Sequence, residues 1–263
     1  MVVVPTMGAL HEGHRVLIEE GRRRAGRNGK LVVTIFVNPS QFEKKEDLEK
    51  YPKRWKSDVR MCREAGVDCL FAPEVKEMYT EDHSVWIDEE ALGKNLCGAS
   101  RPGHFRGVCT IVGKLFHLVS PDIAVFGQKD YQQLAIIRRM VRDLNFPVEI
   151  VACATVRESD GLAMSSRNLR LEPEHRERAP ILYQVLEGAL IAWREGEKSA
   201  AILKRKVRIK LQRCQELELD YLEIVQGESL EKVKKVERGD VMAVAVKFGS
   251  VRLIDNIIFY EDI

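Results

Sequence analysis

The sequence predicts an α/β protein, with a doubly wound parallel sheet followed by a smaller C-terminal α+β domain. Short apolar runs alternate with helical patterns as far as about Ala154, which is typical of repeated βα units. Polar or glycine-rich segments follow the ends of these runs. After about Val156 the pattern changes to two helices and then three strand-like runs. These three observations indicate a Rossmann-like domain and a second, different one.

The first part opens with the apolar run Val2–Val4, which leads through a tight turn into an amphipathic helix beginning near Arg15. Later runs are rich in apolar and β-branched residues, as expected of strands buried on both faces of a parallel sheet. Strands are therefore expected at about 31–37, 67–72, 122–126 and 148–154. Apolar residues at helical spacing predict helices at about 53–65, 108–119 and 131–144.

The second part has a different order of elements. Helices are expected at 173–193 and 199–216, and strands at 219–225, 241–248 and 251–259. The pair Gly249-Ser250 is a hairpin signal between the last two strands. We place the boundary in the loop Arg157–Gly161, which divides the chain into domains 1–157 and 158–263.

Composition limits the classes of function. The 263 residues suffice for one large or two smaller cores. The formal net charge of +2 gives no overall attraction to nucleic acid or membrane, and runs such as Val241–Val246 are too short to span a bilayer. The six cysteines form no Cys-x-x-Cys pair, so we expect reduced thiols without a catalytic role. We therefore expect a cytoplasmic protein that binds neither nucleic acid nor membrane.

The segment Pro5–His14 indicates a phosphate site. His11 and His14 are three residues apart and lie on one face of the predicted helix's first turn. Gly8 lets a ligand approach the backbone, and the helix N-terminus offers unpaired N–H groups and partial positive charge. The segment suits a nucleoside triphosphate. Half of a metal site, or two histidines that cap a surface helix, are the alternatives.

Polar residues also follow the other predicted strands, at the edge of the sheet where ligands bind. Asn38 and Gln41 follow one strand, and the segment Gly127–Gln133 follows another. Together they indicate a polar ligand pocket, although ordinary turn chemistry is an alternative. The loop Asp160–Asn168 carries two serines and an arginine. It can bind phosphate and close over it, or it is a solvated linker.

Five motifs, in order along the chain, resemble the pantoate–β-alanine ligase family. They are Pro5–His14, Phe36–Phe42, Arg101–Val108, Phe126–Leu134 and Met164–Asn168, and the similarity continues to Arg252–Asn256. The resemblance implies that domain 1–157 binds the nucleotide and pantoate, and that the first loop of domain 158–263 closes over the ATP phosphates. It implies two steps: pantoate attacks the α-phosphate of ATP to give pantoyl adenylate and pyrophosphate, and β-alanine then displaces AMP to give pantothenate. It also implies a homodimer.

The resemblance assigns roles to individual residues. The catalytic set is His11, His14, Lys129, Ser165, Ser166 and Arg167. ATP contacts are expected from these six and from Met7, Gly8, Gly127, Asp130, Val156 and Met164, with Asp130 on the ribose and backbone near Val156 and Met164 on adenine. Pantoate and β-alanine contacts are expected from Met7, Asn38, Gln41 and Gln133. Mg²⁺ should bridge the phosphates, and Asp58 is expected to help position it.

Two other classes of protein remain as alternatives. A related nucleotidyltransferase acting on a phosphorylated substrate would need extra basic residues in place of the neutral Gln41 and Gln133. A nucleic-acid-binding protein could use the basic helical run Lys204–Lys210. Acidic residues flank that run, which favours a solvated face.

Overall fold

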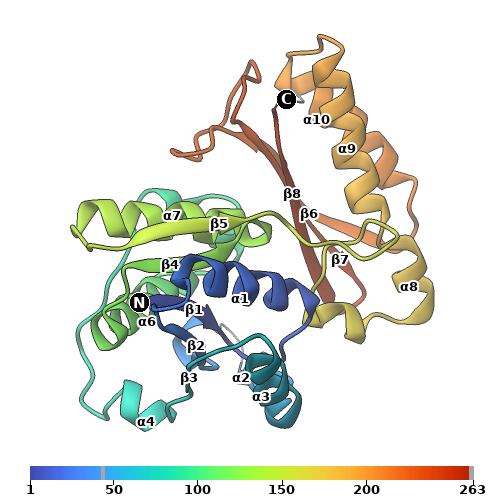
Figure 1. The fold of residues 1–263 in the computed structure, drawn as a ribbon. Coiled ribbons are helices and arrows are strands. Elements are labelled where there is room, and N and C mark those ends of the chain that lie inside the picture. The colour runs from blue at the N-terminus through green and yellow to red at the C-terminus, as the bar shows by residue number, and fades with distance from the viewer. Residues whose placement is uncertain (43–44, 261–263) are drawn as a thin grey trace. The chain divides into compact units, whose positions relative to one another are not determined.

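The computed structural model describes residues 1–42 and 45–260 (Figure 1). Its chain divides into two compact units. The first contains residues 1–128 and 132–155, and the second contains residues 129–131 and the chain from Val156 onward. The domain boundary expected after residue 157 stays a prediction.

The first unit is built on a five-stranded, all-parallel sheet in the order β3-β2-β1-β4-β5. The strands are β1 (Val2–Thr6), β2 (Leu31–Ile35), β3 (Cys69–Phe71), β4 (Ile123–Gly127) and β5 (Glu149–Cys153). The strand order reverses between β1 and β4, and such a switch point is where open α/β sheets bind ligands. The predicted doubly wound fold is confirmed.

Helices and 3-10 turns connect these strands. They are α1 (Glu12–Ala25), η1 (Pro39–Gln41), α2 (Lys45–Glu49), α3 (Trp55–Glu64), α4 (Val75–Met78), η2 (Leu92–Lys94), α5 (Cys97–Ser100), α6 (His104–Val119), η3 (Gln128–Asp130) and α7 (Tyr131–Asp143). Val2 and Val4 of β1 share a buried core with α1 and α3. Val3 points to the opposite face of the sheet. The core therefore lies on both faces of β1 and positions the turn that follows it.

The second unit holds a three-stranded antiparallel sheet in the order β6-β7-β8. Its elements are η4 (Ser166–Arg170), α8 (Pro173–Arg178), α9 (Ile181–Arg194), α10 (Ala200–Gln212), β6 (Leu217–Val225), β7 (Val241–Phe248) and β8 (Val251–Ile258). Helix α10 packs on β6 and α9 packs on β8, and their apolar faces form the second core (Figure 1). The predicted hairpin at Gly249-Ser250 is confirmed.

Several expected boundaries were wrong. The helix expected over 173–193 is two helices, α8 and α9, separated by Ala179 and Pro180; proline cannot donate the hydrogen bond that a continuous helix requires. The helix expected over 199–216 ends at Gln212. Helix α1 begins at Glu12, where the histidine side chains cap it. The short helices α2, α4 and α5 were not expected.

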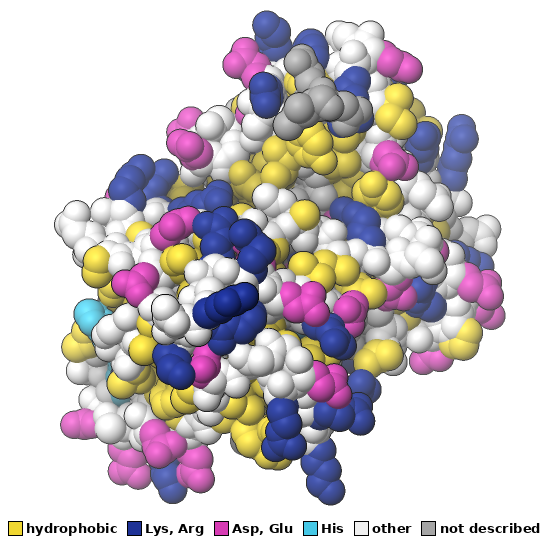
Figure 2. All heavy atoms as spheres, in the orientation of Figure 1, with side chains coloured by type: hydrophobic (Ala, Val, Ile, Leu, Met, Phe, Trp, Pro, Cys, Tyr) yellow, Lys and Arg dark blue, Asp and Glu magenta, His cyan; other side chains and the backbone are white. Residues whose placement is uncertain are grey.

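The described residues show charged side chains of both signs and free thiols. Basic and acidic side chains are interspersed on the face drawn in Figure 2. In the described part of the chain, every helix is too short or too polar to cross a bilayer. All six cysteines are free, and burial raises the pKa of Cys62 to about 11 and of Cys109 to about 12. These two thiols therefore stay protonated at neutral pH, as inert groups do.

Candidate active site

The turn between β1 and α1 is held by side chains from elsewhere in the first unit. Asp58, on α3, is 2% exposed, and its two carboxylate oxygens accept the N–H groups of Ala9 and Leu10, both at 2.9 Å. Gly8 N donates to Thr6 Oγ1 at 3.2 Å. Gly8 and Ala9 have φ of +80° and +52°, a region costly for alanine. The buried carboxylate holds this strained turn in place.

The two histidines of the turn form a reciprocal cap on α1. His11 Nδ1 accepts Gly13 N at 3.2 Å, and His14 Nδ1 accepts His11 N at 3.3 Å. The ring centres lie 4.1 Å apart. A ring nitrogen that accepts carries no proton, so each neutral imidazole has its N–H at Nε2. The capping alternative is thus correct for Nδ1 of both rings.

One expectation about this turn is wrong. The backbone N–H groups of residues 8–11 and 13 donate within the turn, and His14 N donates to His11 O at 2.8 Å. They are not unpaired donors for a ligand. Asp58 uses the two amides that precede the cap, and the His11 side chain uses the Gly13 N–H of the first helical turn. This leaves the turn with few backbone donors, so we assign phosphate recognition mainly to the imidazoles.

The same bonds bear on the expected magnesium contact. Each oxygen of Asp58 faces a backbone amide inside the turn, whereas a magnesium ligand must face the phosphates and the ion's water molecules. Among the residues that the structure describes, no group of three His, Cys, Asp or Glu side chains could hold a metal ion. Asp58 thus fits a turn-holding role better than a metal-ligand role.

Three of the four residues expected to contact pantoate or β-alanine lie together in the first unit. Gln41 Nε2 lies 3.0 Å from Met7 Sδ, and Asn38 Nδ2 donates to Gln41 Oε1 at 3.1 Å. Asn38 Nδ2 also donates to Gly107 O at 3.0 Å. Asn38 is 1% and Gln41 9% exposed. The two amides are thus fixed side by side after β2, in an orientation set by α6.

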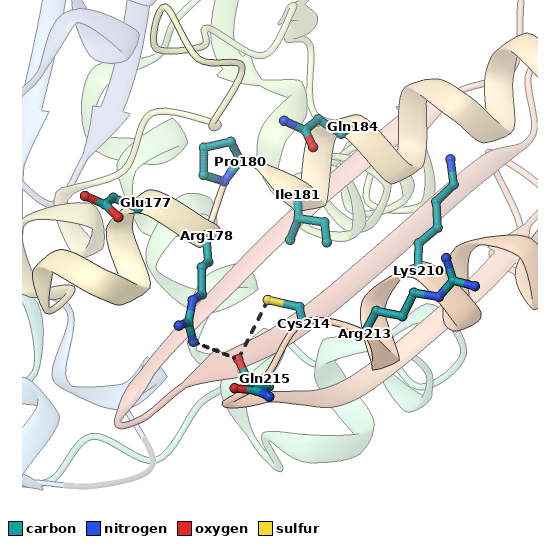
Figure 3. A pocket seen from close by; sticks show the side chains of 9 residues that line it. All are labelled: Glu177, Arg178, Pro180, Ile181, Gln184, Lys210, Arg213, Cys214 and Gln215. Carbon is teal, nitrogen blue, oxygen red and sulfur yellow. Dashed lines mark hydrogen bonds between the residues drawn. The ribbon is translucent and has the colours of Figure 1, made fainter.

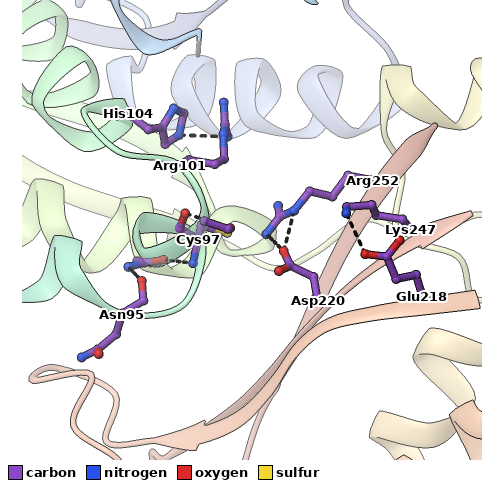
Figure 4. Close-up of polar contacts among 10 residues, drawn as sticks. Asn95, Cys97, Arg101, His104, Glu218, Asp220, Lys247 and Arg252 are labelled. Atoms are coloured by element: carbon purple, nitrogen blue, oxygen red, sulfur yellow. Dashed lines mark hydrogen bonds and ion pairs between the residues drawn. The ribbon is translucent and has the colours of Figure 1, made fainter. Parts of the chain in front are cut away.

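The motif Arg101–Val108 supports this pair. His104 Nδ1 lies 2.8 Å from Gln41 O, and Arg101 Nη2 donates to the same oxygen at 3.2 Å. Arg101 Nη1 lies 3.2 Å from His104 Nε2 (Figure 4). Sequence reasoning used this motif for the resemblance but gave it no role. Its position in the structure identifies it as a backbone clamp on η1.

Neighbouring glutamines on α7 have different environments. Gln132 is buried; its Oε1 accepts Cys97 N at 2.9 Å, and its Nε2 donates to Leu92 O and Asn95 O. It is a structural residue. Gln133, the fourth expected contact, is half-buried and follows β4 on the same helix. The structure therefore leaves Gln133 as the glutamine of this pair suited to a ligand.

The serine loop, residues 156–168 in the second unit, is not a solvated linker. Arg157 and Ala163 form an antiparallel bridge, and Met164 N donates to Val156 O at 2.9 Å. Ser165 Oγ caps η4 by accepting Arg167 N at 3.2 Å, while Ser166 and Arg167 are half-buried. The Arg176 guanidinium holds the pKa of Asp160 below its ordinary value. The loop is braced at both ends.

Lys129 and Asp130 belong to the second unit and lie in η3, directly after β4. Lys129 Nζ is 3.9 Å from Asp130 Oδ2, and the two side chains are 18% and 48% exposed. The backbone carbonyl of Lys129 accepts Asn256 Nδ2 at 2.9 Å. Gly127 is the last residue of β4. A Cβ added there would make only an ordinary van der Waals contact, with Leu17 at 3.9 Å.

A groove of about 450 Å³ lies in the second unit among α8, α9 and α10 (Figure 3). It is lined by Glu177, Arg178, Pro180, Ile181, Gln184, Lys210, Arg213, Cys214 and Gln215. None of these nine residues was expected in the site. Arg178 is bonded to Glu216 at 2.9 Å, so its charge is partly neutralised.

Comparisons with known proteins give one consistent result. The model of the family described as Pantoate-beta-alanine ligase matches residues 1–258. Pantothenate synthetase of Thermotoga petrophila is 51% identical over 255 residues, which cover 97% of this chain and 90% of the relative. Pantothenate synthetase of Akkermansia muciniphila is 49% identical over 257 residues, covering 98% and 91%.

Solved structures agree with these matches. The crystal structure of pantothenate synthetase from Thermus thermophilus gives a TM-score of 0.94 at 47% identity, covering 99% of this chain and 93% of that one. The ligase from Francisella tularensis, complexed with Beta-gamma ATP and Beta-alanine, gives a TM-score of 0.78 at 32% identity and covers 98% and 88%.

Proposed function

The chain belongs to the pantoate–β-alanine ligase family, and from this premise we propose how its residues perform the family's reaction. The enzyme condenses pantoate with β-alanine at the expense of ATP, and it yields pantothenate, AMP and pyrophosphate through pantoyl adenylate. The observation that carries our assignment is the reciprocal histidine cap. It fixes both imidazoles side by side through Nδ1, and we assign the two rings to the phosphates.

The first step needs charge stabilisation more than acid–base chemistry. A carboxylate oxygen of pantoate bonds to the α-phosphorus, the bond from that phosphorus to the β-phosphate oxygen breaks, and pyrophosphate leaves. We assign the phosphate contacts to His11, His14 and Lys129, with Ser165, Ser166 and Arg167 on the departing phosphates. The hydroxyl oxygen of Ser165 accepts Arg167 N, so its proton is available to donate. Donors fixed in advance stabilise developing charge without reorganisation.

The second step needs no new protein nucleophile. The neutral amine of β-alanine attacks the acyl carbon of the adenylate, the bond to the AMP oxygen breaks, and the amine loses a proton to water. AMP carries away the electron pair. We assign the remaining nucleotide contacts to Met7, Gly8, Gly127 and Asp130, and adenine contacts to the backbone of Val156 and Met164.

Neutral amides suit the pantoate pocket. Gln41 and Gln133 can each donate and accept, which matches a ligand with hydroxyls beside a carboxylate. An Arg or Lys in their place would bind the carboxylate more strongly but would reduce its nucleophilicity. Met7 and Asn38 contact Gln41, and we assign them to the same pocket. Gln41 and Gln133 themselves offer no positive charge to a substrate that carried a phosphate, which argues against the related nucleotidyltransferases.

The proposal includes the metal, the assembly and the compartment. ATP is the nucleotide substrate, and Mg²⁺ would neutralise its phosphates as in other phosphate-transfer enzymes. We assign Asp58 to the turn and not to the metal, because both of its oxygens accept backbone N–H groups there. We further propose a homodimer, as the family resemblance implies, and the cytoplasm as the compartment, because ATP is supplied there.

Pyrophosphate exchange tests the assigned chemistry. Labelled pyrophosphate should enter ATP only when pantoate and Mg²⁺ are present, and β-alanine should not be needed, because the adenylate forms first. His14→Ala and Lys129→Ala should each slow exchange by about 10²–10³, the usual cost of losing one preorganised donor. Gln132→Ala controls for general damage to α7 and should mainly lower stability. A requirement for β-alanine would overturn the order of steps, and near-normal exchange in His14→Ala would return the histidines to a purely capping role.

A further inference from the structure

Two adjacent residues of β8, Asp255 and Asn256, have polar side chains that the proposed reaction does not use. They are 2% and 6% exposed. Buried polar groups cost free energy unless they form hydrogen bonds, so their partners indicate what they hold. Those partners are the start of the serine loop and the backbone of Lys129. Both belong to the phosphate machinery proposed above.

Asp255 holds the serine loop. Arg157 Nη1 and Nη2 bond to its two oxygens at 2.6 and 3.0 Å, a bidentate geometry that fixes the guanidinium. Arg157 Nη1 also donates to Gly161 O at 3.1 Å, and the guanidinium lies 3.8 Å from the ring centre of Tyr183. The loop's first turn is therefore attached to β8 by one buried ion pair.

Asn256 holds the turn that carries Lys129. Its backbone N donates to Asp255 Oδ1 at 2.8 Å, and its side-chain Nδ2 donates to Lys129 O at 2.9 Å. Leu253 and Ile257 belong to the core beneath α9 and α10. Side chains alternate along a strand, so Asp255 shares that face and Asn256 lies on the other. One rigid strand thus contacts both phosphate-binding elements with neighbouring residues.

We propose that Asn256, supported by Asp255, is a positioning residue that sets Lys129 relative to the serine loop for adenylation. The proposal rests on the role of Lys129 assigned under the proposed function. A lysine side chain is long and flexible, so the location of its ammonium depends first on its backbone. Short displacements of a charged donor from the transition state reduce rates sharply. The hydrogen bond from Asn256 to Lys129 O fixes the lysine backbone against β8. The same strand also holds Arg157, and with it the serine loop, through Asp255.

A double-mutant cycle in the full-length enzyme tests this mechanism. Asn256→Ala should lower the pyrophosphate-exchange rate at saturating substrates about tenfold, as expected for one lost hydrogen bond. The pantoate concentration for half-maximal exchange should stay unchanged. In a Lys129→Ala background, Asn256→Ala should cause less than about a twofold further loss, because the residue it acts through is gone. The near-isosteric Asn256→Asp, which replaces the donating NH₂ group with a carboxylate oxygen, should behave in the same way.

Lys247→Ala provides the matched control. Lys247 lies on the adjacent strand β7, and its exposed side chain bonds to Glu218 at 2.8 Å (Figure 4). Lys247→Ala should leave the pyrophosphate-exchange rate unchanged in both the wild-type and the Lys129→Ala background. If Asn256→Ala lowered the pyrophosphate-exchange rate by the same factor in both backgrounds, or in neither, the positioning role would be overturned. The proposed function would still stand. Normal exchange in Lys129→Ala alone would overturn both. Thermal melts of every variant separate these outcomes from loss of folding.

Discussion

A single carboxylate shapes the turn that precedes the two histidines. Asp58 comes from α3, 49 positions from Ala9, and it accepts two consecutive N–H groups at 2.9 Å. Consecutive amides that converge in this way form an anion-binding concavity, and here the protein supplies the anion. We therefore assign the phosphates of a ligand to the imidazoles, whose Nδ1 atoms form the cap.

Asp58→Asn tests whether Asp58 holds the turn. The amide retains one acceptor oxygen but turns an NH₂ group toward a backbone N–H, so two donors face each other in a buried site. We expect a loss of about 1–3 kcal/mol in the free energy of unfolding, measured with denaturant in the absence of ATP and Mg²⁺. Pyrophosphate exchange should slow, because the histidine turn loosens.

The magnesium dependence of the same variant separates the two roles of Asp58. A turn-holding residue should leave the Mg²⁺ concentration for half-maximal exchange unchanged, whereas loss of a metal ligand should raise it severalfold. Glu64→Gln is the control, since Glu64 also lies on α3 but its side chain is 52% exposed. A raised magnesium requirement together with unchanged stability would return Asp58 to the metal.

The sequence predicted which residues gather at this turn but not how they bond. His11 and His14 were identified from their spacing, because helical periodicity is local. The contact between Asp58 and Ala9 spans 49 positions, and no local pattern encodes it. For the same reason the buried bond from Asn256 to Lys129, across 127 positions, was not foreseen, although both residues lay in the motifs that carried the resemblance.

At the scale of elements, α6 and η1 pack without a side chain between them. A Cβ added to Gly107 of α6 would lie 2.6 Å from Ser40 O and 2.8 Å from Gln41 N. This close approach brings Gly107 O within 3.0 Å of Asn38 Nδ2. The glycine of the Arg101–Val108 motif is thus required by the backbone of η1, which carries the amides assigned to pantoate.

Gly107→Ala should therefore disturb pantoate use selectively. The added methyl group meets backbone, which cannot rotate away, so η1 must shift. We expect destabilisation of about 1–3 kcal/mol, the usual cost of overpacking, and a several-fold higher pantoate concentration for half-maximal exchange. ATP affinity, measured calorimetrically without pantoate, should change little.

Gly188→Ala on α9 is the matched control for this substitution. Its new Cβ would lie 3.4 Å from Lys210 Nζ, the flexible end of a side chain. Alanine favours a helix over glycine by about 1 kcal/mol, so this variant should be neutral or slightly stabilising. An unchanged pantoate requirement in Gly107→Ala would show that η1 does not position the substrate.

At the scale of the whole molecule, the order and type of the main elements were predictable, and their ends were not. Buried parallel strands are recognisable in a sequence as apolar runs, as β2 and β4 are. The break at Pro180 depends on one missing backbone donor, and no periodicity marks it. Short helices such as α5 bury few residues and leave little periodicity to detect.

The two units differ in the ligands we assign to them. The residues that we assign to pantoate, Met7, Asn38, Gln41 and Gln133, belong to the first unit. Of the residues that we assign to ATP, His14 belongs to the first unit, and Lys129 and Ser165 belong to the second. Ligands slow hydrogen exchange where they stabilise the structure against local opening. The pattern of protection by each ligand alone therefore tests the division.

Hydrogen exchange in the presence of ATP should show slowed amides in the β1–α1 turn and in the serine loop. Pantoate alone should protect the region around η1 and leave the serine loop unchanged. His14→Ala should reduce the protection that ATP gives to the β1–α1 turn and should not alter protection by pantoate. Protection of the serine loop by pantoate alone would assign that substrate to the loop. An unchanged serine loop in the presence of ATP would remove that loop from the proposed nucleotide contacts.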